Sequence, residues 1–468
     1  MADTGDAVGS GASISRRLAQ WSVDVRYDAL PPATRGRVGQ FLLDYLGIAL
    51  RGSTLDSSRP VRSLGQPPGP ATVLGRAGGV GAEWAALANG MAAHSMELDD
   101  TYLPGSVHNE SFVLATVLAL AQERDASGRE VIEATVTGWE VACRAAAALR
   151  PAVTNARGFH PTGTCGALGA ATAAARMLGL DAERTAAAIG IATSQASGLL
   201  EYVTDGAWTK RFHAGWAAHA GIVAARLAAA GMTAPATAIE GRFGFLHAYS
   251  GDPDTDLLLD GLGDGYAIDR TALKYHPCNY YIQSVNDSVL ALVRDGVRAE
   301  DVASVLVHTV SAAVPLVCEP LAVRRRPAVM IDAQFSVPFN VALALSTGRV
   351  SFRDFTPRMF ADPGLRDLMD RVDYRVEPDF DRRYPAEWPG RVDVVLHDGS
   401  TRSAQTLHAR GDPRNPLSWA EVVDKHRGIV AGLVAEPDGD QIIAVVEDLD
   451  RQPDMAALTR ALSRIRVD

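Results

Sequence analysis

The sequence predicts a large all-α helical domain joined to a smaller α+β lid domain, on three observations. A chain of 468 residues with 47% hydrophobic side chains can bury more than one small core. Alanine-rich runs with helical periodicity dominate residues 82–232, and β-branched, alternating runs appear beyond residue 266. We therefore expect a helical domain at 14–265, an α+β lid domain at 266–405, and C-terminal helices at 406–468 that pack back on the helical domain.

The elements of the helical domain follow one another with few breaks. Residues 14–50 have helical periodicity, and "FLLDYLGIAL" gives them a broad apolar face. Residues 53–80 are rich in Gly, Pro and Ser, which predicts a loop. The glycine-rich "GRAGGVGAE" is followed by no lysine and lies in no strand–GxGxxG–helix unit, so a phosphate-binding loop is disfavoured. Alanine-rich helices such as "SFVLATVLALAQE" come next, and their small side chains favour close helix packing.

The lid domain begins where the pattern changes. "DVASVLVHTV" and "RVDVVLHDGS" predict strands, and Asp398–Gly399 predicts a hairpin turn. Ser418 followed by Glu421 is a capping-box pattern that predicts the start of a helix. A last helix is expected in "DMAALTRALSRI".

Composition excludes several classes of function. A formal charge of −10 argues against nucleic-acid binding, which needs a basic face. No apolar run reaches the roughly 18 residues of a membrane span. Residues 1–13 lack the features of a signal peptide and are expected to be a disordered tail. The four cysteines lie far apart with no CxxC pair, which favours a reducing cytoplasm and gives no zinc or iron–sulfur framework.

Lysine is unusually scarce in this chain. Of 45 basic residues only three are lysines, Lys210, Lys274 and Lys425. A surviving lysine can mark a place where arginine would not serve, because a desolvated lysine can lose its proton and arginine essentially cannot. We expect Lys425 to be a surface residue kept by chance, whereas Lys210 and Lys274 stand in unusual surroundings.

The first of four polar clusters is "HSMELDDTYLPGSVHNES", residues 94–111. His94 and Glu97, three residues apart, would share a helix face. Asp99 and Asp100 would follow at the C-terminal end of the helix, where a negative charge interacts unfavourably with the helix macrodipole. Their position therefore indicates a role that offsets this cost. Capping of the next helix by Asn109 or Ser111 would explain only part of this polarity. A metal site is disfavoured, because no HExxH or second ExxH supports the His94–Glu97 pair.

Three further clusters add histidines and cations. His160 lies on a glycine-rich loop, "RGFHPTGTCGA", before a helix, whose N-terminus favours an anion. Lys210 and Arg211 in "WTKRFHAG" suit a substrate carboxylate. In "LKYHPCNYYIQS", Lys274 is expected to be a base or a carboxylate ligand, and a nucleophilic cysteine–histidine pair is disfavoured because nothing nearby lowers the thiol pKa. Each cluster alone also fits a solvated surface or a structural network.

Together the clusters suit one kind of chemistry. They supply cations and proton-transfer groups without a nucleotide, haem or metal signature. That combination favours a cofactor-free reaction on a small polycarboxylate, in which a proton is removed next to a carboxylate and cations stabilise the resulting anion.

Several segments of the chain resemble the MmgE/PrpD family of 2-methylcitrate dehydratases, cis-aconitate decarboxylases and iminodisuccinate epimerases. They are "FLLDYLGIALRG", "LANGMAAHSMELDD", "GFHPTGTCGALGAA", "WTKRFHAGWAAHAG", "KYHPCNYYIQSVND", "DAQFSVPFNVALAL" and "RVDVVLHDGS…DPRNPLSWAEVVDK". The resemblance implies the same large helical domain with a smaller lid, a homodimer, an active site between the domains, and no metal or organic cofactor.

The resemblance also implies site residues, position by position. The family's acidic position, its threonine, its two histidines and its two lysines fall on Glu97, Thr101, His108, His160, Lys210 and Lys274. Three departures stand out. His108 is followed by Asn109 where proline is common, Gln283 stands near a common histidine, and "SAAVPLVCEP" lacks the tyrosine expected of cis-aconitate decarboxylases.

We therefore expect a cytoplasmic, homodimeric lyase that acts on a small di- or tricarboxylate by α-proton abstraction, as a dehydratase. An isomerase, epimerase or decarboxylase using the same proton abstraction, or a non-catalytic binding protein on this fold, stays open. The expected catalytic residues are His108, His160, Lys210 and Lys274. Glu97, Asp100, Thr101 and Arg211 are expected around the substrate: Thr101 and Arg211 with Lys274 would hold carboxylates or the leaving group, and Glu97 and Asp100 would orient the histidines.

Overall fold

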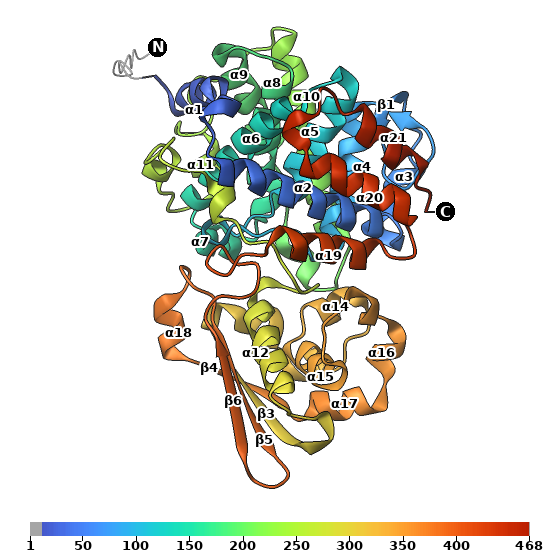
Figure 1. Ribbon diagram of the computed structural model, residues 1–468. Coiled ribbons are helices and arrows are strands. Elements are labelled where there is room, and N and C mark those ends of the chain that lie inside the picture. Colours follow the sequence, from blue (N-terminus) through green and yellow to red (C-terminus); the bar gives the residue numbers. More distant parts are fainter. Residues whose placement is uncertain (1–11, 468) are drawn as a thin grey trace.

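Two bodies stacked end to end make up the computed structural model, which describes residues 12–467 (Figure 1). The larger is helical and the smaller combines a sheet with helices, which confirms the predicted fold class. The expected tail, residues 1–13, lies almost wholly outside the described residues. In the described part of the chain no helix is long and apolar enough to cross a membrane.

The helical body begins with eleven helices and a small two-stranded sheet. The helices are α1 Ile14–Asp24, α2 Pro32–Gly52, α3 Arg59–Ser63, α4 Ala82–His94, α5 Glu110–Arg124, α6 Gly128–Ala148, α7 Pro151–Ala156, α8 Pro161–Met177, α9 Ala182–Thr193, α10 Thr209–Ala229 and α11 Phe245–Tyr249. Strands β1 Pro68–Thr72 and β2 Gly79–Val80 pair antiparallel. The segment expected to be a loop thus contains α3 and this short hairpin.

Small residues bring the central helices close together. A Cβ atom on Gly215 of α10 would lie 2.3 Å from the Leu87 carbonyl oxygen of α4. A Cβ atom on Gly221 of the same helix would lie 2.5 Å from the Ala170 Cβ of α8. Both distances are shorter than atoms tolerate, so the packing of α10 between α4 and α8 requires glycine. This packing fixes the N-terminus of α10, which carries Lys210.

The lid domain is built on a four-stranded mixed sheet. Its strands are β3 Val302–Thr309, β4 Val372–Val376, β5 Gly390–Leu396 and β6 Thr401–Thr406, in the order β4-β3-β5-β6, with only β3 and β4 parallel. Its helices are α12 Gln283–Arg294, α13 Leu321–Arg324, α14 Met330–Gln334, α15 Val337–Thr347, α16 Pro357–Ala361, α17 Pro363–Asp370 and α18 Pro378–Arg383. The predicted hairpin at Asp398–Gly399 joins β5 to β6, with Gly399 at φ +83°.

Two hydrophobic cores show how the chain crosses between the bodies. One core joins buried residues from Leu18 to Leu273 with residues from Leu417 to Ile465. The other lies within residues 278–394. The last helices, α19 Trp419–Val430, α20 Glu436–Glu447 and α21 Ala456–Arg464, therefore share the helical core, and α19 packs on α2. The exact domain boundaries stay predictions.

Local sequence signals explain the start of α19. The Glu421 amide donates to the Ser418 hydroxyl oxygen at 3.3 Å, and the Ser418 amide donates to the Glu421 carboxylate at 2.8 Å. This reciprocal pair confirms the predicted capping box. It fixes the helix that carries Lys425.

Candidate active site

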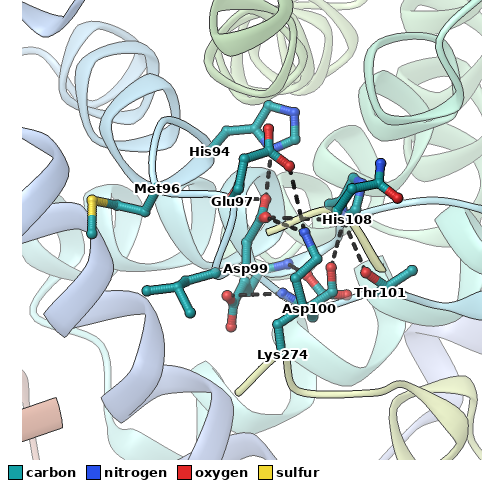
Figure 2. Close-up of polar contacts among 12 residues, drawn as sticks. His94, Met96, Glu97, Asp99, Asp100, Thr101, His108 and Lys274 are labelled. Carbon is teal, nitrogen blue, oxygen red and sulfur yellow. Dashed lines mark hydrogen bonds and ion pairs between the residues drawn. The ribbon is translucent and has the colours of Figure 1, made fainter. Parts of the chain in front are cut away.

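The loop between α4 and α5 carries the acidic half of the site (Figure 2). Helix α4 ends at His94, and Glu97 lies beyond it in the left-handed region at φ +53°. The expectation that His94 and Glu97 share a helix face is therefore wrong. The left-handed turn is unfavourable for a side chain with a Cβ atom, so the surrounding contacts must hold it. Glu97, Asp99 and Asp100 are all buried.

Lys210 and Lys274, two of the three lysines in the chain, both contact this loop. The ammonium of Lys210 bonds one carboxylate oxygen of Glu97. The ammonium of Lys274 lies 3.8 Å from the other oxygen of Glu97 and 3.3 Å from the Asp99 carboxylate. Figure 2 shows Lys274, Glu97 and Asp99 pointing toward one another. Lys210 is 4% exposed and Lys274 1%, so two ammonium groups and two carboxylates share a space nearly closed to water.

The charges in this group shift one another's pKa values. Burial lowers the pKa of Lys210, and the nearby Lys274 charge acts in the same direction, although Glu97 opposes both. Burial also opposes the charge on Lys274, but Asp99 and Glu97 outweigh it and raise the pKa of that lysine. Burial would raise the pKa of Glu97, but Lys210 and Lys274 outweigh it and lower this pKa to about 2. Lys274 is thus a fixed cation, and Lys210 releases its proton more readily than a free lysine.

Backbone pairing explains how residues so far apart in sequence meet. The Thr101 amide donates to the Ala272 carbonyl at 2.8 Å, and the Ala272 amide donates to the Thr101 carbonyl at 2.9 Å. This antiparallel bridge sets Lys274 beside Asp99. The bridge also brings Thr101 into the site, where its hydroxyl lies 3.3 Å from the His108 Nδ1.

We expected the third lysine, Lys425, to lie on the surface, but it is buried. It is 9% exposed, and its ammonium donates to the Asp44 carboxylate at 2.8 Å. It also donates to the Lys274 carbonyl at 2.6 Å and to the Leu98 carbonyl at 3.2 Å. Because one carbonyl lies between Glu97 and Asp99 and the other belongs to Lys274, Lys425 ties both loops of the candidate site to α19.

Four histidine rings lie close together beside the charged group. The His94 ring centre lies 5.3 Å from that of His108 and 5.8 Å from that of His160. The His160 and His213 Nδ1 atoms are 3.0 Å apart. The His108 Nδ1 lies 2.5 Å from the Asp100 carbonyl oxygen, which can only accept a hydrogen bond. His108 therefore carries its proton on Nδ1 when neutral, and its Nε2 is left as the basic atom.

Burial favours the neutral form of three of these histidines, His108, His160 and His213. Burial lowers the pKa of His108 to about 3, helped by the charge of Lys274. Burial and the neighbouring His213 lower the pKa of His160 well below its ordinary value. Burial likewise lowers the pKa of His213 to about 4. A neutral imidazole is the form that accepts a proton, and an anionic substrate bound beside it would raise its pKa.

Asp100, which the sequence predicts to lie around the substrate, has its carboxylate at the start of α5. Its carboxylate accepts from the Glu110 amide at 2.7 Å and from the Asn109 side chain at 3.1 Å, at the N-terminus of α5. Burial and the Asp99 charge raise its pKa to about 7. Asp100 thus caps the helix, a task the sequence assigned to Asn109 or Ser111. It orients His108 only through its backbone carbonyl.

Arg211 lies beside Lys210 on α10, as its sequence position requires. It is 8% exposed, and burial lowers its pKa while the Glu97 charge acts in the opposite direction. Within residues 12–467 no hydrogen bond or ion pair holds its guanidinium group. Its donors are therefore available to a ligand carboxylate.

A small cavity of about 70 Å³ adjoins this group where the two domains meet. Tyr202 lines it from the helical domain and Phe335 from the lid. The Tyr202 ring centre is 5.7 Å from that of His160, and the Lys210 ammonium is 5.0 Å from the Phe335 ring centre. Both aromatic rings thus stand between the cavity and the charged group.

Sequence reasoning left four neighbours out of the proposed site. Asp99 accepts from the Ser111 hydroxyl at 2.9 Å and pairs with His94 Nδ1 at 2.5 Å. The Nε2 of His94 is buried and has no hydrogen-bond partner in the described part of the chain. Tyr202 and His213 complete the group. His94, Asp99 and His213 stood inside the quoted clusters, so cluster membership was their signal, whereas nothing in the sequence marked Tyr202.

The three departures from the family pattern have structural counterparts. The Asn109 side chain donates to Asp100, and the Gln283 side chain donates to the carbonyls of His276 and Cys278 at 2.8 and 3.1 Å. Gln283 thus shapes the loop after Lys274. Pro315 and Leu316, from the segment without tyrosine, give the small cavity an apolar wall. Among the described residues no group of three His, Cys, Asp or Glu side chains is arranged to hold a metal ion.

This fold and site define a class: two-domain proteins in which cations, carboxylates and imidazoles are buried where a helical domain meets a lid. Two sequence profiles give the family. The MmgE/PrpD N-terminal domain matches residues 16–258, and the MmgE/PrpD C-terminal domain matches residues 276–451. The chain belongs to the MmgE/PrpD family.

Similar proteins include decarboxylases from fungi and mammals. A cis-aconitate decarboxylase-like protein, oryM, of Aspergillus oryzae is 25% identical over 96% of this chain and 97% of its own length. A cis-aconitate decarboxylase of Aspergillus terreus is 25% identical over 97% of this chain and 96% of its own. That of Mus musculus is 27% identical over 81% of this chain and 78% of its own.

Proposed function

We propose that this protein is a cofactor-independent lyase that removes a proton next to a carboxylate of a small di- or tricarboxylate and eliminates water. The observation that carries the proposal is the bridge Lys210–Glu97–Lys274 beside His108 and His160, whose pKa values burial lowers. Fixed cations lower the energy of the anion formed when a carbon acid ionises, and the water-poor setting strengthens their effect. Relatives with names that denote lyases on a tricarboxylate support the same class.

In this proposal His108 is the base. Its Nδ1 proton is held by the Asp100 carbonyl, so Nε2 faces the reaction as the free lone pair. Substrate carboxylates bind Lys274 and Arg211, and their negative charge raises the His108 pKa toward the working pH. The proton then moves from the substrate carbon to Nε2, and the electron pair of the C–H bond remains on the carbon, stabilised by Lys274.

Loss of the hydroxyl completes the elimination. The carbon electron pair forms the new double bond as the neighbouring C–O bond breaks, and the departing oxygen takes a proton to leave as water. Lys210 is the proposed acid, because burial lowers its pKa and Glu97 holds it in place. His160, 6.5 Å between ring centres from His108, is the alternative donor on the same side.

Replacing Lys210 with alanine tests this assignment. We expect turnover to be lost while the fold, followed by near-UV circular dichroism, is retained. The matched control is Arg382→Ala, which removes an exposed cation from the lid. Near-parental turnover by Lys210→Ala would reject the assignment.

Decarboxylation is the second candidate, since the relatives are named for it. The apolar wall of Pro315 and Leu316 supports dehydration instead, because a tyrosine is expected there in the decarboxylases. An epimerase would return the proton without losing a group. Incubation with candidate acids in heavy water separates the three: water loss, carbon dioxide release, or deuterium gain alone. Tight binding of an acid without any of these outcomes would favour a binding protein.

We further propose a homodimer. Exposed aromatic residues on and before α10, Trp208 at 47% and Phe212 at 39%, form an apolar surface with the neighbouring Val203, and Phe212 stacks on Trp216. Such patches favour association. Light scattering should give a dimer for the parent and a monomer for Phe212→Lys; a monomeric parent would contradict this. Four buried, free cysteines support a cytoplasmic location.

A further inference from the structure

A second cavity is lined by residues of both domains, including Leu98 and Tyr275 from the loops of the candidate site. We call it the arginine pocket, and its volume is about 760 Å³, within the range of metabolite sites. The helical domain contributes Arg51 of α2 and residues of α19, and the lid contributes Arg294 of α12 and Gly348–Arg353 after α15. Both domains thus form its walls.

The floor of the arginine pocket is the back of the candidate active site. Leu98, which stands between Glu97 and Asp99, lines it, as do Tyr275 and Lys425. The Lys425 ammonium donates to the carbonyls of Leu98 and Lys274. A ligand here would touch the chain segments that carry the catalytic charges without touching the charges themselves.

Arg51 and Arg353 have no carboxylate partner among residues 12–467. The Arg51 side chain donates to the carbonyls of Ile429 and Ala431, both at 2.8 Å, and Arg353 donates to the Ala431 carbonyl at 2.9 Å. Burial lowers the pKa of Arg51, and the charge of Arg353 lowers it further, so the two guanidinium groups repel. Carbonyl partners leave each guanidinium group with unused N–H donors.

The other charged groups of the pocket are mostly committed to each other. Arg410 pairs with Glu421 at 2.6 Å. Asp287 bonds the His276 ring at 2.8 Å and accepts from the Arg410 amide at 2.6 Å. The Nδ1 of His276 is buried, and none of the residues that the structure describes offers it a hydrogen bond.

Arg294 of the lid also has no carboxylate partner within residues 12–467, since its one hydrogen bond is to the Leu290 carbonyl. Asp424, on α19, is exposed and has no ion pair there either. Arg51, Arg353 and Arg294 therefore leave an excess of positive charge facing the cavity, in a chain whose formal charge is −10.

We propose that the arginine pocket binds a small metabolite with two or more anionic groups, phosphate or carboxylate. One anionic group bridges Arg51 of the helical domain and Arg353 of the lid, where it removes their mutual repulsion. A second group reaches Arg294 across the cavity. Occupation clamps the lid to the helical domain behind the catalytic loops. This site is separate from the candidate active site, and the proposal does not depend on the reaction catalysed there.

Calorimetric titration of the full-length protein at low salt tests the proposal, with inorganic pyrophosphate and tricarballylate as probes for the two anionic chemistries. The informative variant is Arg294→Gln/Arg353→Gln, because both side chains are exposed and their loss should leave the fold intact. We expect it to weaken binding of the preferred probe by about tenfold or more. The matched control is Arg326→Gln/Arg382→Gln, which removes two lid arginines outside the pocket and should bind as the parent does.

Three results would overturn the proposal. The first is that neither probe binds. The second is that the pocket variant and the control variant weaken binding equally. The third is that Lys210→Ala loses all binding whereas Arg294→Gln/Arg353→Gln binds as the parent does. The last result would place the probe in the candidate active site instead. The probe that binds more tightly identifies phosphate or carboxylate as the recognised group.

Discussion

Each domain buries a histidine between carboxylates and a cation, and the two clusters differ in instructive ways. In the helical domain, His94 pairs with Asp99 at 2.5 Å, and Lys274 lies 3.3 Å from the same carboxylate. In the lid, His308 of β3 pairs with Asp393 of β5 at 2.7 Å and accepts a hydrogen bond from Arg391 at 3.0 Å. The partners are similar, but the surroundings are not.

The lid cluster lies on paired strands and remains in contact with water. Asp393 is 25% exposed and Arg391 33%, and the register sets His308 opposite Arg391. Asp99 and Lys274 are at most 1% exposed and come from segments 175 residues apart. The histidine–carboxylate contact of the lid therefore joins two paired strands and stabilises the sheet. Convergence of distant, buried charges is the feature that supports our proposal of a catalytic site there.

The largest expected effect comes from the helical cluster. Lys210→Ala should lower kcat/KM by about 1000-fold, because it removes the proposed proton donor to the departing oxygen. Arg391→Ala, its counterpart in the lid, should stay within about twofold, since a partly exposed pair contributes little. Steady-state kinetics on one substrate measures both. Equal losses in the two variants would break the comparison.

A smaller loss is expected for Lys425→Met. This lysine touches no substrate in our proposal, but it bonds the carbonyls of both catalytic loops. Loss of such a supporting contact should lower kcat by about 10–100-fold with little change in KM. Arg427→Met, which removes an exposed arginine from the same helix, is the control. Unchanged kcat in Lys425→Met would mean that the loops hold their positions without it.

The lid histidine should matter for stability alone. His308→Asn loses its bond to Asp393, so we expect the free energy of unfolding to fall by about 1–2 kcal/mol while kcat/KM stays within about twofold. Urea denaturation and kinetics together check this. A large loss of activity would show that the lid cluster also takes part in the reaction.

The smallest expected effect is a change in the number of protons that the protein takes up on unfolding. His108 has its pKa lowered to about 3 in the folded protein from an ordinary value of 6.5. Between these values the unfolded chain holds a proton on His108 that the folded protein lacks, so this residue's contribution to stability rises with pH across that window. At about pH 5, His108→Asn should take up about one proton fewer on unfolding than the parent. If the free energy of unfolding changed with pH equally in the parent and in His108→Asn, His108 would be charged in the folded state.

Features that depend on neighbouring residues, and residues marked by their scarcity, could be predicted from the sequence. The capping box of Ser418 and Glu421 and the turn at Asp398–Gly399 depend on neighbours in the chain, so they could be predicted. Lys210 and Lys274 were marked by the scarcity of lysine and by their surroundings, and the structure brings them together on Glu97.

Contacts between distant segments were not readable. Lys425 was misplaced because its partner Asp44 lies 381 residues away. The misjudged helix position of Glu97 came from a helix end that periodicity cannot fix to a single residue. Only the fold shows that the Asp100 carboxylate accepts a hydrogen bond at the start of α5.

The account's central claim is that a carbon acid is ionised between Lys210, Lys274 and His108. The most direct test incubates the protein in heavy water with a panel of small di- and tricarboxylates and follows each acid by NMR and mass spectrometry. We predict that the parent eliminates water from, or places deuterium next to a carboxylate of, at least one acid, and that Lys210→Ala and His108→Asn do neither. Equal reaction in those two variants would contradict the claim.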